Sequence, residues 1–128
     1  MVKNILIING SPKRDGNTAA LVEWFADGAR SEDAQVEIVQ AASLKLKAAG
    51  CTSCRACQTI KEYRCVIDDD AAPVLAKMVG ADAIVMASPL YFFAASAQLK
   101  AVVDRMFSLY KWDNEKGTMQ TPLAGKTF

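Results

Sequence analysis

An apolar run followed at once by a loop rich in Gly, Ser and Asn constrains this chain more than any other stretch. Ile5-Leu6-Ile7-Ile8 is typical of a strand in a parallel sheet that is covered on both faces. Asn9-Gly10-Ser11-Pro12-Lys13-Arg14-Asp15-Gly16-Asn17-Thr18 follows it and leads into a helix. The start of a helix offers free backbone N–H groups and about half a positive charge, which favour an anion. The pattern predicts a phosphate site, although an ordinary capped loop explains the same residues equally well.

The residues of this loop indicate which class of phosphate-containing ligand it suits. The loop lacks the Gly-x-x-x-x-Gly-Lys-Ser/Thr pattern of nucleoside triphosphatases and the Gly-x-Gly-x-x-Gly fingerprint of bound dinucleotides. Its side chains supply hydroxyl and amide donors from Ser11, Asn17 and Thr18 and positive charge from Lys13 and Arg14. Such a polar loop suits a phosphate monoester such as that of FMN.

Alternating strand and helix patterns predict an α/β fold with a doubly wound parallel sheet, in a three-layer α/β/α arrangement. We expect strands at 3–9, 34–40 and 82–87, and helices at 17–30, 68–79 and 95–110. Right-handed crossovers place the first strand between the other two, and polar alternation predicts that the second lies at an edge. In the first helix, Leu21, Phe25 and Ala29 share one face.

The later part of the chain is predicted from its apolar spacing. Val74, Leu75 and Met78 should face the core from the second helix. The third helix carries an i, i+3, i+4, i+7 stripe of Leu99, Val102, Val103, Met106, Phe107 and Tyr110. Residues 111–124 are polar and predict a loop, and 125–128 predict the start of a fourth strand.

A second loop, Ser88-Pro89-Leu90-Tyr91-Phe92-Phe93, follows the third strand. Doubly wound sheets bind ligands at the carboxyl ends of their strands, so this loop and the first one should converge. Three aromatic side chains without a charge suit a flat apolar ring such as isoalloxazine. The alternative is that they only cover the end of the sheet.

Composition excludes several classes of function. The net charge of +1 gives no electrostatic basis for binding nucleic acid or an anionic membrane. No apolar run approaches the ~20 residues of a membrane span, and the first residues show no signal-peptide pattern, so we expect a cytoplasmic protein. His is absent, which removes Ser-His and Cys-His catalysis and His-containing zinc sites.

Three motifs in order resemble the NADPH-dependent FMN reductase branch of the flavodoxin-like superfamily. They are Gly10-Ser11-Pro12-Lys13 with Gly16-Asn17-Thr18, then Ser88-Pro89-Leu90-Tyr91-Phe92, then Ser96-Ala97-Gln98-Leu99-Lys100 with Asp104-Arg105. The resemblance implies a flavin-dependent oxidoreductase with bound FMN and a transient NAD(P)H donor. It implies that Ser11, Lys13, Asn17 and Thr18 hold the phosphate, with Arg14 secondary. It also implies that Pro89, Leu90, Tyr91 and Phe92 border the isoalloxazine, with Phe93 secondary.

Four cysteines, Cys51, Cys54, Cys57 and Cys65, are clustered in the sequence. Three cysteines at x2 spacing can bind three corners of a cubane, and a fourth thiolate can arrive from farther along the chain. Zinc sites more often use separated Cys-x2-Cys pairs or include His. The spacing therefore favours a [4Fe–4S] cluster over zinc, while free thiols and disulfides stay open.

The cysteine run also resembles that of the iron–sulfur flavoproteins, a branch of the same family, and so does the following Val66-Ile67-Asp68-Asp69-Asp70. This resemblance implies electron transfer through FMN and a [4Fe–4S] cluster, and a homo-oligomer in which electrons cross between subunits. The alternatives are an NAD(P)H-dependent FMN or quinone reductase without a cluster, and a non-enzymatic or truncated flavin-binding module.

The resemblance further implies a sheet of five strands. We interpret 1–128 as a single flavodoxin-like domain with an inserted Cys loop at 50–66, truncated after the start of strand four. The C-terminal strands and a third flavin-contacting loop of the fold are then expected to be missing.

Overall fold

A three-stranded parallel sheet in the order β2-β1-β3 is the centre of the computed structural model, which describes residues 3–128. The strands are β1 (Asn4–Asn9), β2 (Gln35–Gln40) and β3 (Ala83–Ala87). Ile7 in β1 lies opposite Ile38 on one side and Val85 on the other. The central place predicted for the first strand and the edge place predicted for the second are confirmed.

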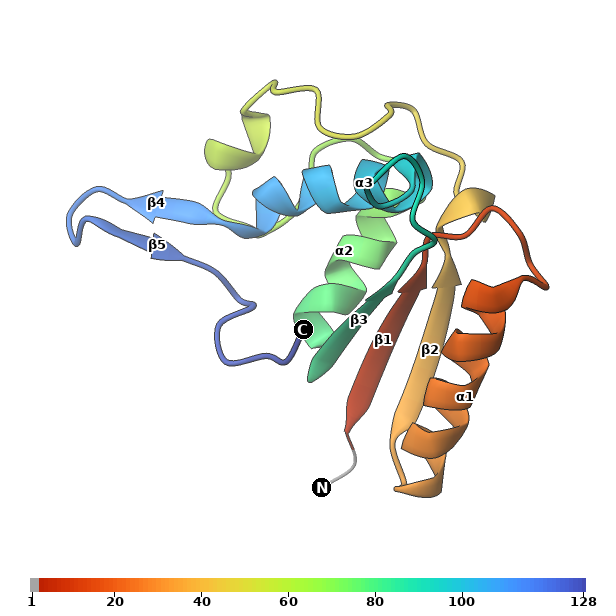
Figure 1. The fold of residues 1–128 in the computed structure, drawn as a ribbon. Coiled ribbons are helices and arrows are strands. Elements are labelled where there is room, and N and C mark those ends of the chain that lie inside the picture. Colours follow the sequence, from red (N-terminus) through yellow and green to blue (C-terminus); the bar gives the residue numbers. More distant parts are fainter. Residues whose placement is uncertain (1–2) are drawn as a thin grey trace.

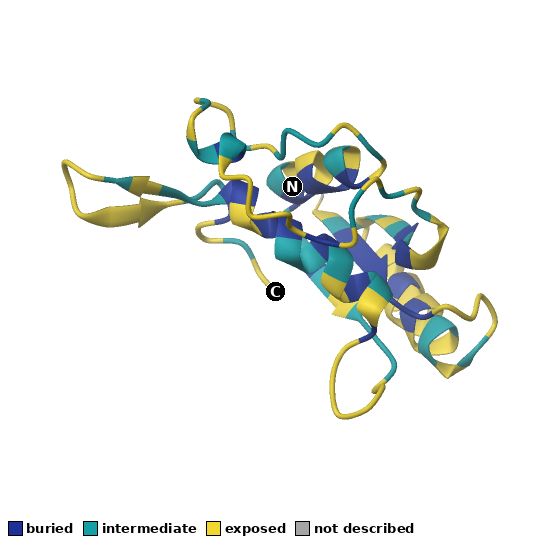
Figure 2. Cartoon of the chain, turned by 90° about the horizontal axis from the view of Figure 1, so that it is seen from above, coloured by how far each residue is buried: buried dark blue, intermediate teal, exposed yellow. Residues whose placement is uncertain are grey.

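Helices lie on both faces of this sheet (Figure 1). They are α1 (Asn17–Ser31), α2 (Ala71–Gly80) and α3 (Ala97–Val103). Ile7 packs with Val22 and Ala26 of α1, whereas Leu6 and Ile8 belong to the larger cluster that includes residues of α2 and α3. Successive residues of β1 therefore serve opposite cores, as the alternation of side chains along a strand requires. In Figure 2 the buried positions follow these inner faces, while exposed positions dominate the loops.

Helix α2 agrees closely with its sequence pattern. Val74, Leu75 and Met78 are all buried against the sheet, as predicted. The expected beginning at the Asp68–Asp70 acidic run shifts slightly, because the first helical residue is Ala71. None of the helices in the described part of the chain is long and apolar enough to cross a membrane.

The inner face of α1 differs from the expectation. Leu21 and Phe25 are 61% and 47% exposed, whereas Val22 and Ala26 are buried. Both pairs have i, i+4 spacing, so the period fits either face and only packing against the sheet selects one. Leu21 and Phe25 instead border a shallow groove beside Ile7.

The single third helix that the sequence predicts at 95–110 is an α-helix followed by a 3₁₀ helix. Only α3 is α-helical, and a 3₁₀ segment, η3 (Asp104–Leu109), continues it. A 3₁₀ helix has about three residues per turn, so the apolar stripe rotates relative to the core after Val103. Met106 is buried as expected, but Phe107 is 48% exposed and Arg105 turns inward.

The chain after η3 is more ordered than predicted. Residues 111–124, expected as a loop, include an antiparallel hairpin of β4 (Lys111–Asp113) and β5 (Thr118–Gln120). The strand expected to begin in 125–128 does not form, and only an isolated parallel bridge joins Thr127 to Ala83 at the outer edge of β3. There Ile84 N–H donates to Thr127 O at 2.9 Å, and Thr127 N–H donates to Asp82 O at 3.2 Å.

The packing of the two helical layers gives a matched test. Leu75→Ala should lower the free energy of unfolding by about 2–5 kcal/mol, because Leu75 is buried between α2 and the sheet. The chemically identical Leu21→Ala should change it by about 0.5 kcal/mol or less, because Leu21 is on the surface. Urea denaturation of both variants measures the difference. Equal losses would contradict the orientation of α1.

Candidate functional site

Two loops meet at the carboxyl end of the sheet, as predicted, and hydrogen bonds join them. Gly10 N–H donates to Ala87 O at 2.7 Å, which links the ends of β1 and β3. The hydroxyl of Ser96 donates to Gly10 O at 2.6 Å, and the N–H of Ser96 donates to the hydroxyl of Ser88 at 2.8 Å. Ser96 is completely buried and therefore fixes the two loops relative to each other.

Gly10 is needed because the chains approach so closely here. A Cβ at this position would lie 2.6 Å from Leu99 Cβ, 2.8 Å from Ser96 Oγ and 3.2 Å from Ala87 O. Ser96 also caps α3, since its Oγ accepts the N–H of Leu99 at 3.2 Å. The beginning of α3 is thus held directly against the first loop.

The first loop is folded on itself. Ser11 N–H donates to Asn9 Oδ1 at 2.9 Å, and Lys13 N–H donates to Ser11 Oγ at 3.2 Å. Ser11 is buried, but its hydroxyl proton is still available to a ligand. Helix α1 begins at Asn17 after Gly16, which has no side chain to accept bonds from the first-turn N–H groups. These donors are suited to an anion.

The other predicted phosphate residues lie around this helix start. Lys13, Arg14 and Asn17 are exposed, and Thr18 is half-buried. Arg14 Nη2 reaches Ser43 Oγ at 3.5 Å, so this side chain leans toward the segment after β2. Arg14 also lines a pocket beside the start of α1, together with Asn9 and Gly16.

The second loop presents its aromatic residues at a tight turn. Tyr91 N–H donates to Ala94 O at 2.9 Å, and Ala94 N–H donates back to Tyr91 O at 3.1 Å. Between them, Phe92 and Phe93 have φ values of 44° and 65°. A type I′ turn requires a positive φ at both of its central residues. Bulky residues adopt this region at a cost, so the turn holds a strained conformation.

The aromatic side chains of this turn point into solvent. Phe92 and Phe93 are 94% and 89% exposed, and their rings contact each other edge-to-face with centroids 5.6 Å apart. Leu90 and Tyr91 are also exposed, and Pro89 is half-buried. These residues are not part of the core of residues 3–128.

All four predicted metal ligands line one narrow pocket. The pocket is formed by Cys51, Cys54, Cys57 and Cys65 together with residues of η3, among them Arg105, Phe107 and Ser108. Cys57 is buried and Cys65 is half-buried, whereas Cys51 and Cys54 are exposed. All four are free thiols, so the disulfide alternative is not the state of this structure.

Backbone donors surround the sulfur atoms of the Cys loop. Ser53 and Arg55 both have φ of 58°, and Ser53 N–H donates to Cys51 Sγ at 3.4 Å. The backbone N–H of Ala56 and then the Thr52 hydroxyl stabilise the thiolate of Cys54, which lowers the pKa of this thiol. The thiolate is the form that binds metals, so the loop favours the ligating form of Cys54.

Contacts from Lys111 and Gln58 anchor the Cys loop to the rest of the fold. Lys111 Nζ donates to Cys57 O at 2.9 Å and also to Ile60 O. Gln58 Nε2 donates to Tyr110 O at 3.0 Å. At the start of the loop, Gly50 has φ of 106°, and a Cβ there would lie 3.1 Å from the carboxylate of Asp104. The loop therefore depends on η3 and β4.

A buried ion pair lies beside the pocket. Arg105 Nη1 contacts both carboxylate oxygens of Asp69, at 2.6 and 2.7 Å, and both side chains are almost inaccessible to solvent. Asp69 also accepts the N–H groups of Lys47 at 2.9 Å and Ala71 at 3.1 Å. Burial opposes ionisation of Asp69, but Arg105 and then these N–H groups outweigh it and hold its pKa below the ordinary value.

The four thiols that line the pocket are the donor set that a [4Fe–4S] cluster takes. Within residues 3–128, no group of three or more His, Cys, Asp or Glu side chains is placed to hold a metal ion. A single zinc ion needs its thiolates to converge on one point, whereas a [4Fe–4S] cluster takes each thiolate at a different iron. Four thiols around one pocket match the second requirement.

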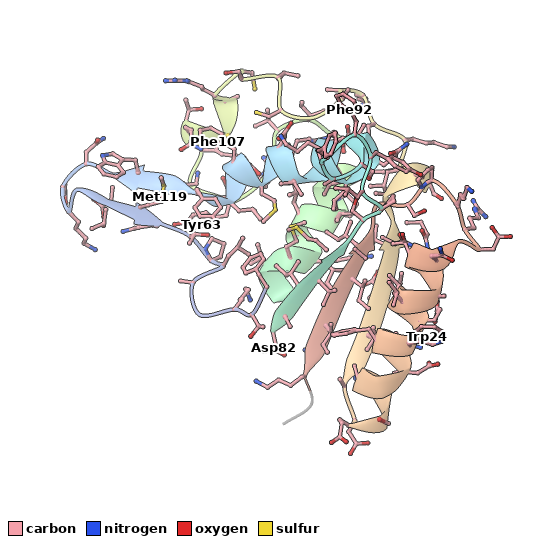
Figure 3. The ribbon with its side chains drawn as sticks, in the orientation of Figure 1. Trp24, Tyr63, Asp82, Phe92, Phe107 and Met119 are labelled. Carbon is pink, nitrogen blue, oxygen red and sulfur yellow. The ribbon has the colours of Figure 1, made fainter. Side chains whose placement is uncertain are left out.

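The two loops and the Cys pocket lie along the same end of the sheet. Figure 3 shows Phe92 of the aromatic loop and Phe107 of the pocket on the same edge of the molecule. One helical segment connects them, because Ser96 caps α3 and Arg105 is in η3. At ~1.5 Å per residue these two residues are separated by roughly 14 Å along the helix.

Several structural residues of the site were not identified from the sequence. Ser96 belongs to the third motif, but it is not predicted as a helix cap, although a Ser directly before a helix is a capping signal. Arg105 also belongs to the third motif, but its burial is not predicted, although a lone cation within an apolar helical stripe suggests a buried ion pair. Nothing in the sequence pattern indicated that Gln58 of the Cys loop would bind Tyr110 O, or that Lys111 would bind Cys57 O in this loop.

Comparison with known proteins gives consistent matches. The family model described as NADPH-dependent FMN reductase matches residues 3–128. An iron-sulfur flavoprotein of Methanocaldococcus jannaschii is 38% identical over 101 residues, which are 79% of this chain and 50% of that protein. An iron-sulfur flavoprotein of Methanosarcina thermophila is 34% identical over 98 residues, 77% of this chain and 49% of that protein. The chain thus spans about half the length of the curated relatives it matches.

A solved structure shares the fold. An NAD(P)H:quinone oxidoreductase from Methanothermobacter marburgensis superposes with a TM-score of 0.67 at 18% identity, covering 84% of this chain and 54% of the other. The parallel sheet and its helices are therefore arranged as in a known α/β fold. At 18% identity the match shows the fold alone.

The contact between the loops can be tested with glycine variants. Gly10→Ala should destabilise the protein by about 1–3 kcal/mol, because the added methyl group overlaps Leu99 and Ser96. Gly28→Ala in α1 should be stabilising by about 0.5–1 kcal/mol, because its Cβ meets nothing within 4 Å and Ala favours helix. Chemical denaturation of both proteins gives the comparison. A neutral Gly10→Ala would mean that the loops do not pack as described.

The Asp69–Arg105 pair predicts a specific pH dependence. Because the folded pKa of Asp69 is lowered, its stabilisation is present above the unfolded value of about 3.9 and is lost as pH falls through the folded value. Asp69→Asn should cost about 3–5 kcal/mol at neutral pH, and the gap to wild type should narrow in acid.

Denaturation of both proteins at several pH values measures that gap. Asp27→Asn is the matched control, since Asp27 pairs with Arg30 on the surface and should matter by at most about 1 kcal/mol. A gap that does not change with pH would contradict the ionised pair.

Proposed function

Because the chain belongs to the NADPH-dependent FMN reductase family, we propose that it transfers electrons from a reduced donor to an acceptor through FMN and a [4Fe–4S] cluster. The observation that carries this proposal is the single pocket lined by all four cysteines, at the same end of the sheet as the two ligand loops. Since the chain contains no His, thiolates are its natural soft metal ligands.

The FMN phosphate is assigned to the first loop. Free N–H groups at the start of α1 and the exposed ammonium of Lys13 would neutralise its charge. The hydroxyl groups of Ser11 and Thr18 and the amide of Asn17 would donate further hydrogen bonds, with Arg14 at the periphery. Pre-folding of the loop around Asn9 and Ser11 reduces the entropy lost on binding.

The isoalloxazine ring is assigned to the second loop. Pro89, Leu90, Tyr91, Phe92 and Phe93 would border it. Burying the exposed Phe92 and Phe93 against a flat ring would remove a large apolar area from water. Ser96 would keep this loop and the phosphate loop at a fixed separation, which a rigid ligand spanning both requires.

Bound FMN supplies the redox chemistry, and the chain supplies placement and hydrogen-bond donors around it. This division agrees with the absence of His, since hydride transfer to a flavin needs no side-chain acid or base. The donor is proposed to be NAD(P)H that binds transiently, because the loop after β1 lacks the dinucleotide fingerprint.

The cluster is assigned to Cys51, Cys54, Cys57 and Cys65. The lowered pKa of Cys54 and the N–H donor to Cys51 favour thiolate sulfur in the pocket. Two curated relatives that share about a third of their matched residues with this chain carry the name iron-sulfur flavoprotein, which supports the same assignment. A bound cluster would add one-electron transfer to the two-electron chemistry of FMN.

A second candidate is an NAD(P)H-dependent FMN or quinone reductase without a cluster. It is supported by the solvent exposure of Cys51 and Cys54, and by the match of residues 3–128 to the NADPH-dependent FMN reductase family. The homo-oligomer, the cytoplasmic location and the single truncated domain expected from the sequence stay predictions.

Anaerobic purification and cluster reconstitution of the full chain would test the proposal. Wild-type protein should contain FMN, iron and acid-labile sulfide, with a visible flavin spectrum and an EPR signal after reduction. Cys57→Ser should lose most of the iron and keep FMN, because Cys57 lies in the pocket and not in a flavin loop. Ser53→Ala, a change in the same loop without a thiol, should keep both.

The other outcomes separate the candidates. FMN without iron after reconstitution, together with NAD(P)H oxidation, would replace the proposal with the cluster-free reductase. A colourless protein that binds neither FMN nor iron would contradict both.

A further inference from the structure

Arg105 is the most unusual side chain in the fold. It is charged, its side chain is fully buried, and it lines the pocket of the four cysteines. Its Nη1 is bound to Asp69, and its Nη2 donates to Ile67 O at 3.0 Å. Its Nε has no hydrogen-bond partner within the described part of the chain. A buried donor without a partner is destabilising, so an acceptor for it is expected.

The two members of the ion pair differ in their relation to the pocket. Arg105 lines it beside Cys65, whereas Asp69 does not contribute to its lining. Burial opposes the charge of Arg105, but Asp69 and then Cys65 outweigh it and raise the pKa of the guanidinium above its ordinary value. Asp69 is turned to the backbone N–H groups of Lys47 and Ala71. The cation is therefore the nearer charge to the cysteines.

The walls of the pocket strengthen the effect of that charge. Ile67, Val66 and Phe107 line it with apolar surface next to Arg105. An electrostatic interaction is screened less by such a wall than by water. Arg55 also lines the pocket but is exposed, so solvent screens its charge.

We propose that Arg105 is a positioning residue that raises the reduction potential of the cluster held by the four cysteines, through a fixed positive charge and an unpartnered Nε–H donor in the wall of the same pocket. This inference rests on the proposed function. In the reduction one electron enters from the NAD(P)H-reduced flavin, and no bond forms or breaks. The bound group becomes more negative by one unit, and a buried cation stabilises the more negative form.

The rival explanation is that Arg105 only holds Asp69, and with it the segments at Lys47 and Ala71, in place. The two explanations differ in sign. If Arg105 is a scaffold, breaking the pair from either side should act alike. If its charge acts on the cluster, removing Arg105 should lower the reduction potential, whereas removing Asp69 should not lower it.

The test measures midpoint potentials by EPR-monitored redox titration of anaerobically reconstituted full-length variants, with iron, sulfide and circular dichroism as further readouts. Arg105→Gln should lower the potential by at least about 59 mV, a tenfold change in a one-electron equilibrium. Asp69→Asn should leave it unchanged or raise it. Arg105→Lys keeps the charge and should lie between wild type and Arg105→Gln. Arg55→Gln, the exposed matched control, should shift it little.

A protein with an unpaired buried Asp69 can fail to fold, so the double variant Arg105→Leu/Asp69→Leu removes both charges. It should also lower the potential, because it still removes the nearer cation. Loss of the cluster from the Arg105→Gln and double variants, with normal loading of Asp69→Asn, would also support the proposal.

Full iron content with an unchanged potential in Arg105→Gln or the double variant would overturn the proposal. So would the same shift, or the same loss of cluster, in Arg105→Gln and Asp69→Asn. A wild-type protein that assembles no cluster would instead overturn the proposed function, and the role of Arg105 with it.

Discussion

The hydroxyl of Ser96 is the contact on which the arrangement of this molecule depends. It donates to Gly10 O and accepts from Leu99 N–H, so one buried oxygen joins the end of β1 to the start of α3. The N–H of the same residue binds Ser88 after β3. Two loops that are far apart in sequence are thereby fixed at one end of the sheet, and α3 leaves that point in a defined direction.

The direction of α3 in turn places the cysteines. η3 continues α3 and carries Arg105 into the interior, where it binds the carboxylate of Asp69. Asp69 contacts the segment before the Cys loop and the first turn of α2, while η3 supplies Phe107 to the pocket wall. A change at the flavin loops and a change at the pocket therefore act on the same helical segment.

The parts of the fold that the sequence predicts correctly are those where a local apolar pattern is compatible with only one way of packing. The continuous apolar run of β1 and the buried face of α2 with Leu75 were identified correctly, because no other packing hides those side chains. Leu21 on α1 was placed wrongly, because two faces of that helix have the same spacing. The hairpin of β4 and β5 was missed, because its strands are short and its residues polar.

The sequence by itself determined the α/β order of elements, the two ligand loops and the cysteine spacing, since these follow from periodicity and residue chemistry within short windows. Only the tertiary structure decided that the four cysteines share one pocket, that Ser96 joins the loops, and that Arg105 is buried beside Cys65. Each of these depends on contacts between distant segments. The chain changes from α-helix to 3₁₀ helix after Val103, and Arg105 is buried in the 3₁₀ segment, where it contacts Asp69.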